Sequence, residues 1–180
     1  EYDSLETVHF VLHSCIYPII IKTVTPPKYM PNMCENRVKV FGNPEQLAKV
    51  SQIFKDEKSV FNNIIQSPDW RRLPNAKGEF SKLEQMKNPK GEVMWETYNF
   101  PDGTNDDRWF HWNNTNWGTK WDVNAKSVEI EYEDEEQLEV SFDTAWAPPE
   151  PICYRLREMF EDLHISWFYN EPDMDLAGYL

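Results

Sequence analysis

The chain has 180 residues, of which 40% are hydrophobic and 14% aromatic, enough for one compact domain with its own core and too apolar for global disorder. Lys and Arg number 18 and Asp and Glu number 31, so the formal net charge is −13. That charge argues against a surface that tracks nucleic-acid phosphates, and it fits a basic protein partner or a mimic of nucleic-acid charge.

The first 29 residues form an N-terminal extension that precedes MPNMCENRVKVFG, a phrase that indicates a natural start at Met30. We expect the extension to add little to the core; the alternative is that its apolar residues add a strand or a swapped arm. Its apolar run at 11–24 is too short to span a bilayer and lacks the basic region of a signal peptide. The sequence therefore predicts no membrane segment. The ending NEPDMDLAGYL stops just after a glycine, as if a longer chain were cut there.

Cys15, Cys34 and Cys153 are odd in number and none has CxxC spacing, so the sequence favours neither a disulfide framework nor a zinc knuckle. We expect a reducing, cytoplasmic setting, with Cys34 and Cys153 as small buried residues.

The first regular elements come after position 34. ENRVKVFG alternates apolar and polar residues, which predicts a strand over 36–41. Asn43 and Pro44 then cap and begin a helix over 44–56. Residues 67–107 are rich in turn residues and poor in periodicity, and we interpret them as a long insertion of the kind that carries function.

The aromatic segment WFHWNNTNWGTKWD, residues 109–122, is expected to open as a strand through Trp109–Trp112 and to pass into an Asn/Gly turn. SVEIEYEDEEQLEVSFDTAW then predicts a hairpin of strands 127–133 and 138–144, with Val128, Ile130 and Tyr132 sharing its buried face.

A helix over 152–163 and a strand over 164–169 complete the pattern. Two helices on one face of an antiparallel sheet give an α+β, ferredoxin-like split βαβ domain over residues 30–180.

Four phrases resemble one family of proteins: MPN-C-NRV-V-G, NWGTKWD, FDTAW-PP-P and Y-EPDMD-AG, at Met30–Gly42, Asn116–Asp122, Phe142–Pro151 and Tyr169–Gly178. In this order they are similar to the Api92-like, or DUF1281, proteins of phages, plasmids and bacteria. The resemblance covers most of residues 30–178. It implies a ferredoxin-like fold and a bacterial or phage-infected cell, and it transfers no catalytic residue, because the family has no established activity.

The aromatic segment supports two interpretations. Tryptophans beside amides can stack on bases or sugars, whereas the favoured interpretation is core packing around a turn. In that case NWGTKWD and FDTAW meet at one end of the sheet, with Trp117 and Trp146 largely buried, and Lys120 lies over an indole or pairs with Asp122 or Asp143.

His111, Asp122, Asp143 and Glu171 are candidates to converge near the sheet's rim, where acid–base chemistry would need them. Their spacing matches no metal-ligand motif, so the sequence predicts no metal and no cofactor, and the favoured interpretation of these residues is structural. With Trp117, Lys120 and Trp146 they make up the candidate cleft.

The predicted hairpin carries Glu129, Glu131, Glu133, Glu139 and Asp143 on one face. Like charges across a sheet repel, so Arg37 and Lys39 on the neighbouring strand are expected to compensate Glu139 and Asp143. Otherwise the surplus acid marks a surface for a basic partner.

Together these observations favour a macromolecular binding or interaction module. The alternatives are an enzyme with its cleft between the 67–107 insertion and the aromatic segment, and a protein that binds single-stranded nucleic acid through exposed tryptophans. The acidic charge makes nucleic acid the less favoured partner.

Overall fold

The computed structural model describes residues 32–180 of the chain. The expectations for residues 1–29 and for a start at Met30 fall outside this range. Within the range, no helix is long and apolar enough to cross a membrane.

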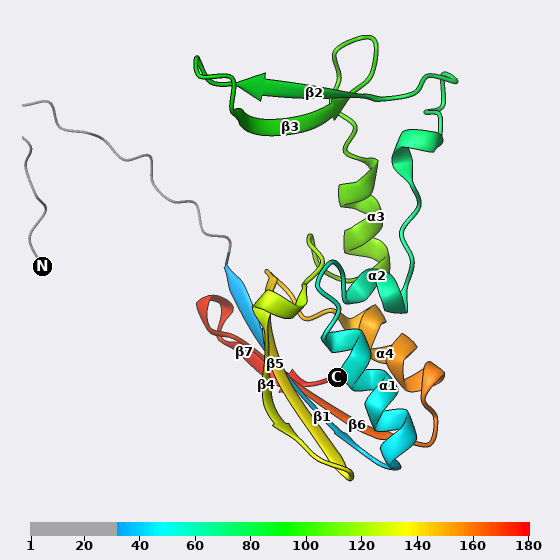
Figure 1. Cartoon of the computed structure of the whole chain (residues 1–180), viewed down its shortest axis with the longest axis vertical. Coiled ribbons are helices and arrows are strands. Elements are labelled where there is room, and N and C mark those ends of the chain that lie inside the picture. The colour runs from blue at the N-terminus through cyan, green and yellow to red at the C-terminus, as the bar shows by residue number, and fades with distance from the viewer. Residues whose placement is uncertain (1–31) are drawn as a thin grey trace, which may run out of the picture. The chain divides into compact units, whose positions relative to one another are not determined.

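Five strands form one antiparallel sheet, in the spatial order β4-β5-β1-β6-β7 (Figure 1). The strands are β1 Met33–Phe41, β4 Val128–Glu133, β5 Gln137–Ala145, β6 His164–Glu171 and β7 Leu176–Tyr179. The β4–β5 hairpin lies beside β1, and β6 pairs with the other edge of β1. This is the ferredoxin-like order, and it confirms the predicted fold.

Strand β7 was not predicted from the sequence. After β6, Glu171 accepts a hydrogen bond from Met174 N at 2.6 Å and Asp175 adopts a left-handed conformation, with φ 53°. These two features reverse the chain, and Leu176–Tyr179 pairs antiparallel with β6. A four-residue strand of this kind is too short to show an alternating pattern.

Helices α1 (Pro44–Phe54) and α4 (Glu150–Met159) lie on one face of the sheet, as predicted (Figure 1). The Asn43 side chain accepts a hydrogen bond from Gln46 N at 2.9 Å and so caps α1, while Pro44 takes the first helical position. Both helices pack on the sheet in a core whose fully buried members include Val38, Val40, Val50, Phe54, Val140, Ile152, Leu156 and Trp167. No described helix covers the opposite face, which we call the open face (Figure 1).

A buried amide joins the three central strands. Asn36 on β1 is fully buried, and its Nδ2 donates to Thr144 Oγ1 on β5 at 2.9 Å. Its Oδ1 accepts from Trp167 Nε1 on β6 at 3.0 Å. A buried polar group is costly unless it is paired, so this arrangement favours one alignment of β1 between its neighbours.

A β-bulge between Ile130 and Tyr132 changes which face β4 presents. The hairpin prediction placed Tyr132 with Val128 on the buried face, and this is wrong. Because the bulge adds one residue, Tyr132 lies opposite Glu139, on the open face, and Glu133 lies opposite buried Leu138.

Glu133 therefore points toward α1 and not toward the acidic strand residues. It accepts from Ser51 Oγ at 2.6 Å and pairs with Lys55 Nζ at 2.6 Å. Lys55 and Ser51 both lower the pKa of Glu133. The bulge thus removes one carboxylate from the open face and uses it to hold α1.

The insertion has more regular structure than its turn-rich sequence predicted. It contains a hairpin of β2 (Lys82–Lys87) and β3 (Val93–Asn99). Helix α2 (Phe61–Ile64) precedes it, and helix α3 (Arg108–Asn116) follows it. Short 3-10 helices lie at Trp70–Arg72, Ala125–Ser127 and Pro172–Met174. Every residue of β2 is exposed, so the hairpin adds little to the core, which explains its weak hydrophobic pattern.

Replacing Glu133 by alanine should lower the free energy of unfolding by about 1–3 kcal/mol, because the Ser51 hydroxyl, which is 4% exposed, loses its acceptor. Urea unfolding of the variant measures this loss. The matched control is Glu135→Ala in the hairpin turn, where the residue is exposed and a change within about 0.5 kcal/mol is expected. Equal effects of the two variants would contradict the role given to the bulge.

Candidate functional site

The aromatic segment begins as a helix, so the predicted strand through Trp109–Trp112 is wrong. Three of its polar side chains bond back to the helix backbone. Asn114 Nδ2, Thr115 Oγ1 and Asn116 Nδ2 each donate to the backbone carbonyl four residues earlier, at 2.6, 2.9 and 2.9 Å. These side chains thus bind the helix that carries them.

Trp117, at the end of α3, is largely buried, as predicted, with 5% of its surface exposed. Its Nε1 donates to Ile65 O at 2.8 Å, and its ring meets Phe61 and Trp112 edge to face, with centroids 6.2 and 5.6 Å away. Trp117 is therefore a core residue and offers no free ring face.

The two phrases NWGTKWD and FDTAW meet after the end of β5, as predicted. Thr119 Oγ1 donates to Ala145 O at 3.0 Å, and the rings of Trp121 and Trp146 stack with centroids 6.4 Å apart. Gly118 makes this approach possible: its φ is 81°, and a Cβ there would lie 2.9 Å from Pro151 Cδ.

Trp146, however, is 42% exposed, so the prediction that it is buried is wrong. Its φ of 68° is left-handed, which is rare for a bulky residue. This conformation ends the regular alternation of β5, so the position of the side chain can no longer be read from the strand pattern.

Lys120 lies over aromatic rings and does not pair with a carboxylate. Its Nζ is 4.4 Å from the ring centre of Trp121, 5.3 Å from that of Trp146 and 5.7 Å from that of Phe110. Among the ion pairs within residues 32–180, none joins Lys120 to Asp122 or Asp143.

Asp122 caps the start of α2. Its carboxylate accepts from Phe61 N at 2.7 Å, Asn62 N at 3.0 Å and Val123 N at 2.7 Å. Burial raises the pKa of Asp122, and these hydrogen bonds oppose the rise. The contacts give Asp122 a structural role.

His111 and Glu171 contact different residues from those that Asp122 contacts. His111 is exposed on α3, with its Nε2 3.8 Å from Asp107 Oδ2. Glu171 is 1% exposed and caps the turn before β7. Within the described part of the chain, no group of three His, Cys, Asp or Glu side chains is placed to hold a metal ion. Of the seven candidate residues, Lys120 and Trp146 lie together, whereas His111, Asp122 and Glu171 have separate contacts. The joint role of the seven in a cleft stays a prediction.

Cys34 and Cys153 are buried free thiols, as expected. Burial raises the pKa of each to about 11, which makes both poor nucleophiles at neutral pH.

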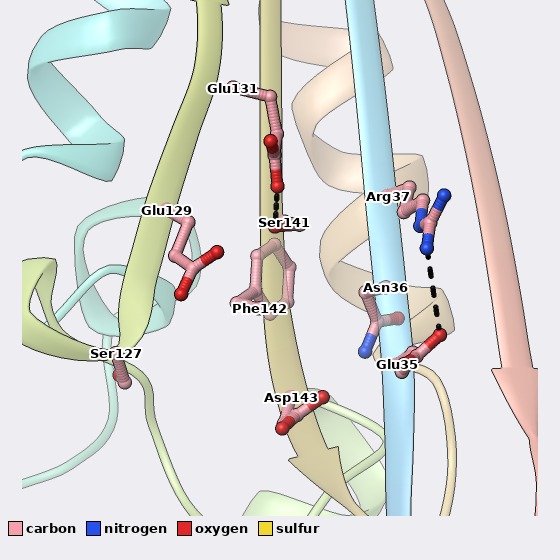
Figure 2. Close-up of a pocket in the computed structure, with 9 residues that line it drawn as sticks. All are labelled: Glu35, Asn36, Arg37, Ser127, Glu129, Glu131, Ser141, Phe142 and Asp143. Atoms are coloured by element: carbon pink, nitrogen blue, oxygen red, sulfur yellow. Dashed lines mark hydrogen bonds and ion pairs between the residues drawn. The ribbon is translucent and has the colours of Figure 1, made fainter.

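Asp143 lies in a different setting, at a hollow on the open face with a volume of about 280 Å³ (Figure 2). We call it the acidic hollow. Four carboxylates line it, from three neighbouring strands: Glu35 on β1, Glu129 and Glu131 on β4, and Asp143 on β5.

Only one cationic side chain, Arg37, lines the acidic hollow. Partial burial raises the pKa of Asp143, and the charges of Glu35 and Glu129 raise it further.

Of the two predicted charge compensations, the one at Glu139 is confirmed and the one at Asp143 is wrong. Lys39 faces Glu139 across the β1–β5 ladder, with Nζ 3.0 Å from Oε2. Arg37 lies opposite Ser141, not Asp143, and its guanidinium is 4.0 Å from Glu35 on its own strand. Glu35 itself lies opposite Asp143, so two carboxylates face each other where Arg37 was expected to face Asp143. The alternation of β1 could have placed Glu35 on this face, but only the register shows what lies opposite.

The other half of the open face carries aromatic side chains. Phe168 on β6 and Tyr179 on β7 meet edge to face with ring centroids 5.3 Å apart, and Phe41 lies 6.1 Å from His164. Tyr179 is 73% exposed. The open face thus combines a carboxylate-rich half with an exposed aromatic half, and Arg37 and Lys39 on β1 carry its cations between them.

Replacing Asp143 by asparagine should raise the free energy of unfolding at pH 7 by a few tenths of a kcal/mol or more, since it removes like-charge repulsion. The folded pKa of Asp143 is raised, so the ionised carboxylate costs stability at neutral pH and the protonated one does not. The gain should shrink as pH falls through this raised pKa.

Urea unfolding of both proteins from pH 4 to 8 measures this difference, and added salt should reduce it. A gain that persists at pH 4, or a loss at pH 7, would contradict the repulsion.

Replacing Trp117 by alanine should cost about 3–5 kcal/mol of stability, as for other buried tryptophans. Thermal and urea unfolding measure the loss. Trp95→Ala in the exposed hairpin is the matched control, with an expected cost under about 1 kcal/mol. A similarly small loss at Trp117 would show that its indole is not part of the core.

Three comparisons with known proteins bear on identity. Residues 111–180 match the family model described as "Ferredoxin-like domain in Api92-like protein". The crystal structure of a protein api92 from Yersinia pseudotuberculosis is similar over 83% of this chain and 93% of that chain, with 13% sequence identity and a TM-score of 0.46. No curated protein matches the sequence. The match of the family model confirms the resemblance to Api92-like proteins over residues 111–180, which contain three of the four phrases.

Proposed function

We propose that this chain, whose residues 111–180 match the model of the ferredoxin-like domain in Api92-like proteins, is a protein-interaction module that binds a basic partner segment on its open face. The observation that supports this most is the acidic hollow, where four carboxylates face one arginine. A partner's Lys or Arg side chain entering there would relieve the repulsion around Asp143.

The aromatic half of the open face supplies the second part of the recognition. The partly exposed Phe168 and the exposed Tyr179 line a hollow of about 240 Å³ together with Arg37 and Lys39. Aromatic side chains are enriched at the centres of protein interfaces, while carboxylates set the choice and orientation of the partner. The partner segment is therefore one that carries both cationic and apolar side chains.

Nucleic acid fits this face poorly, because its phosphates would approach Glu35, Glu129, Glu131 and Asp143. We place the interaction in the cytoplasm of a bacterial or phage-infected cell. The two free buried thiols of the described residues support a reducing setting.

The test uses the full chain and a fluorescently labelled peptide that alternates lysine with phenylalanine. In the test variant, Glu35, Glu129 and Glu131 become Gln and Asp143 becomes Asn. We expect the peptide's affinity to fall at least about tenfold in this variant and to weaken with salt, since the charges act across a solvent-exposed face.

The matched control removes the same four charges elsewhere. It carries Gln at the exposed residues Glu57, Glu135 and Glu161 and Asn at Asp173. Its affinity should stay within about twofold of the unmodified chain, because these residues lie off the acidic hollow. Equal losses in both variants would assign the binding to net charge alone, and no loss in the test variant would rule out the open face.

A further inference from the structure

A second hollow lies between the insertion and the first turn of α3, and it shares no lining residue with the acidic hollow. Its volume is about 450 Å³, within the usual range for small-molecule sites. Three partly exposed aromatic residues line it: Trp70, Tyr98 and Trp109. We call it the aromatic hollow. It occupies the place where the enzyme alternative put its cleft.

Arg108 holds the walls of the aromatic hollow together. Its guanidinium donates to the backbone carbonyls of Trp70, Leu73 and Pro74, each at 3.0 Å. It also lies over the rings of Trp70 and Phe100, at 5.3 and 5.2 Å from their centres. One side chain thus ties the start of α3 to two parts of the insertion, so the hollow is formed before any ligand arrives.

Both carboxylates in the wall are already engaged by arginines. Asp106 accepts two bonds from Arg108, each at 2.7 Å, and Asp69 accepts from Arg71 Nε and Nη2 at 2.7 and 2.9 Å. These bidentate pairs neutralise the wall and occupy the carboxylate oxygens. The engagement argues against acid–base chemistry at these two residues and against attraction of a cationic ligand.

The hollow retains polar groups without partners. Trp70 Nε1 makes no hydrogen bond among the described residues, and buried Ser81 Oγ makes none of good geometry, although Asp106 lies near it. Buried polar groups of this kind are normally satisfied by a partner, by water or by a ligand. Both atoms are covered by protein, so they belong to the wall and are not contacts for a ligand.

We propose that the aromatic hollow binds one uncharged, flat heteroaromatic ring of the nucleobase class, stacked on the indole of Trp109, because Arg108 already lies over the ring of Trp70. The aromatic walls favour a flat ring, and the neutralised carboxylates favour an uncharged one. A sugar fits less well, because its many hydroxyls need several hydrogen-bond partners and the carboxylates of Asp69 and Asp106 already accept from arginines.

Such a ring can come from a free nucleoside or from a base in a single strand. The small volume of the hollow and the net charge of −13 favour the free nucleoside.

The experiment titrates the full chain with adenosine, guanosine, cytidine and uridine, and separately with ribose, choline and a mixed single-stranded oligonucleotide. Isothermal calorimetry and ligand-observed NMR measure binding. We expect at least one nucleoside to bind, ribose and choline to show no binding, and the oligonucleotide to bind no more tightly than the nucleoside.

Trp109→Leu should weaken nucleoside binding at least about tenfold, because it removes a stacking surface. Trp95→Leu is the matched control: this residue is exposed on β3 and does not line the hollow, so binding should be unchanged. Circular dichroism checks that both variants fold. If Trp109→Leu does not fold, NMR shifts of the Trp70 and Trp109 indole N–H signals in the unmodified chain decide the location.

Four outcomes would overturn the proposal. They are the absence of nucleoside binding at millimolar concentration, equal binding of ribose, unchanged binding in the folded Trp109→Leu variant, and nucleoside-induced shifts that spare both indoles. Tighter binding of the oligonucleotide would instead identify single-stranded nucleic acid as the ligand, and it would overturn the choice of a free nucleoside.

Discussion

The buried amide of Asn36 is the constraint on which the rest of the sheet depends. Its contacts with Thr144 and Trp167 join β1 to both neighbouring strands in one register. A slip by one residue would leave the amide unpaired in the core and would turn every side chain of β1 to the other face. The same register that packs Val38 and Val40 under the helices therefore places Glu35 opposite Asp143.

The bulge in β4 divides the acidic residues of the hairpin between two roles. Glu133 turns to the helix face and holds α1 through Ser51 and Lys55, whereas Glu129 stays at the acidic hollow. Glu131, at the bulge itself, accepts from Ser141 Oγ at 2.7 Å and also lines the hollow. One short strand thus carries two surface carboxylates followed by one structural carboxylate, and only the structural one is paired with a cation.

The insertion follows a different principle from the sheet. Its hairpin buries little, and polar contacts hold its base: the Arg108 guanidinium binds three backbone carbonyls and Asp106, and Asp122 caps α2. Packed apolar elements tolerate exchange of similar residues, whereas a hub of directed hydrogen bonds depends on one side chain. The domain therefore combines a core fixed by burial with a hollow fixed by a single arginine.

The amino-acid sequence by itself determined the sheet and its two helices, because alternation and helical spacing report burial directly, as Val38, Val40 and Val140 show. It also indicated the resemblance to Api92-like proteins and the burial of Trp117. Only the tertiary structure decided the rest. The helix over Arg108–Asn116 buries one residue, Asn113, so it has no apolar pattern from which it could be predicted. The exposure of Trp146 depends on one left-handed φ, and the face of Glu133 on one extra residue in β4. Register and backbone handedness arise from contacts between distant segments, so local sequence patterns do not encode them.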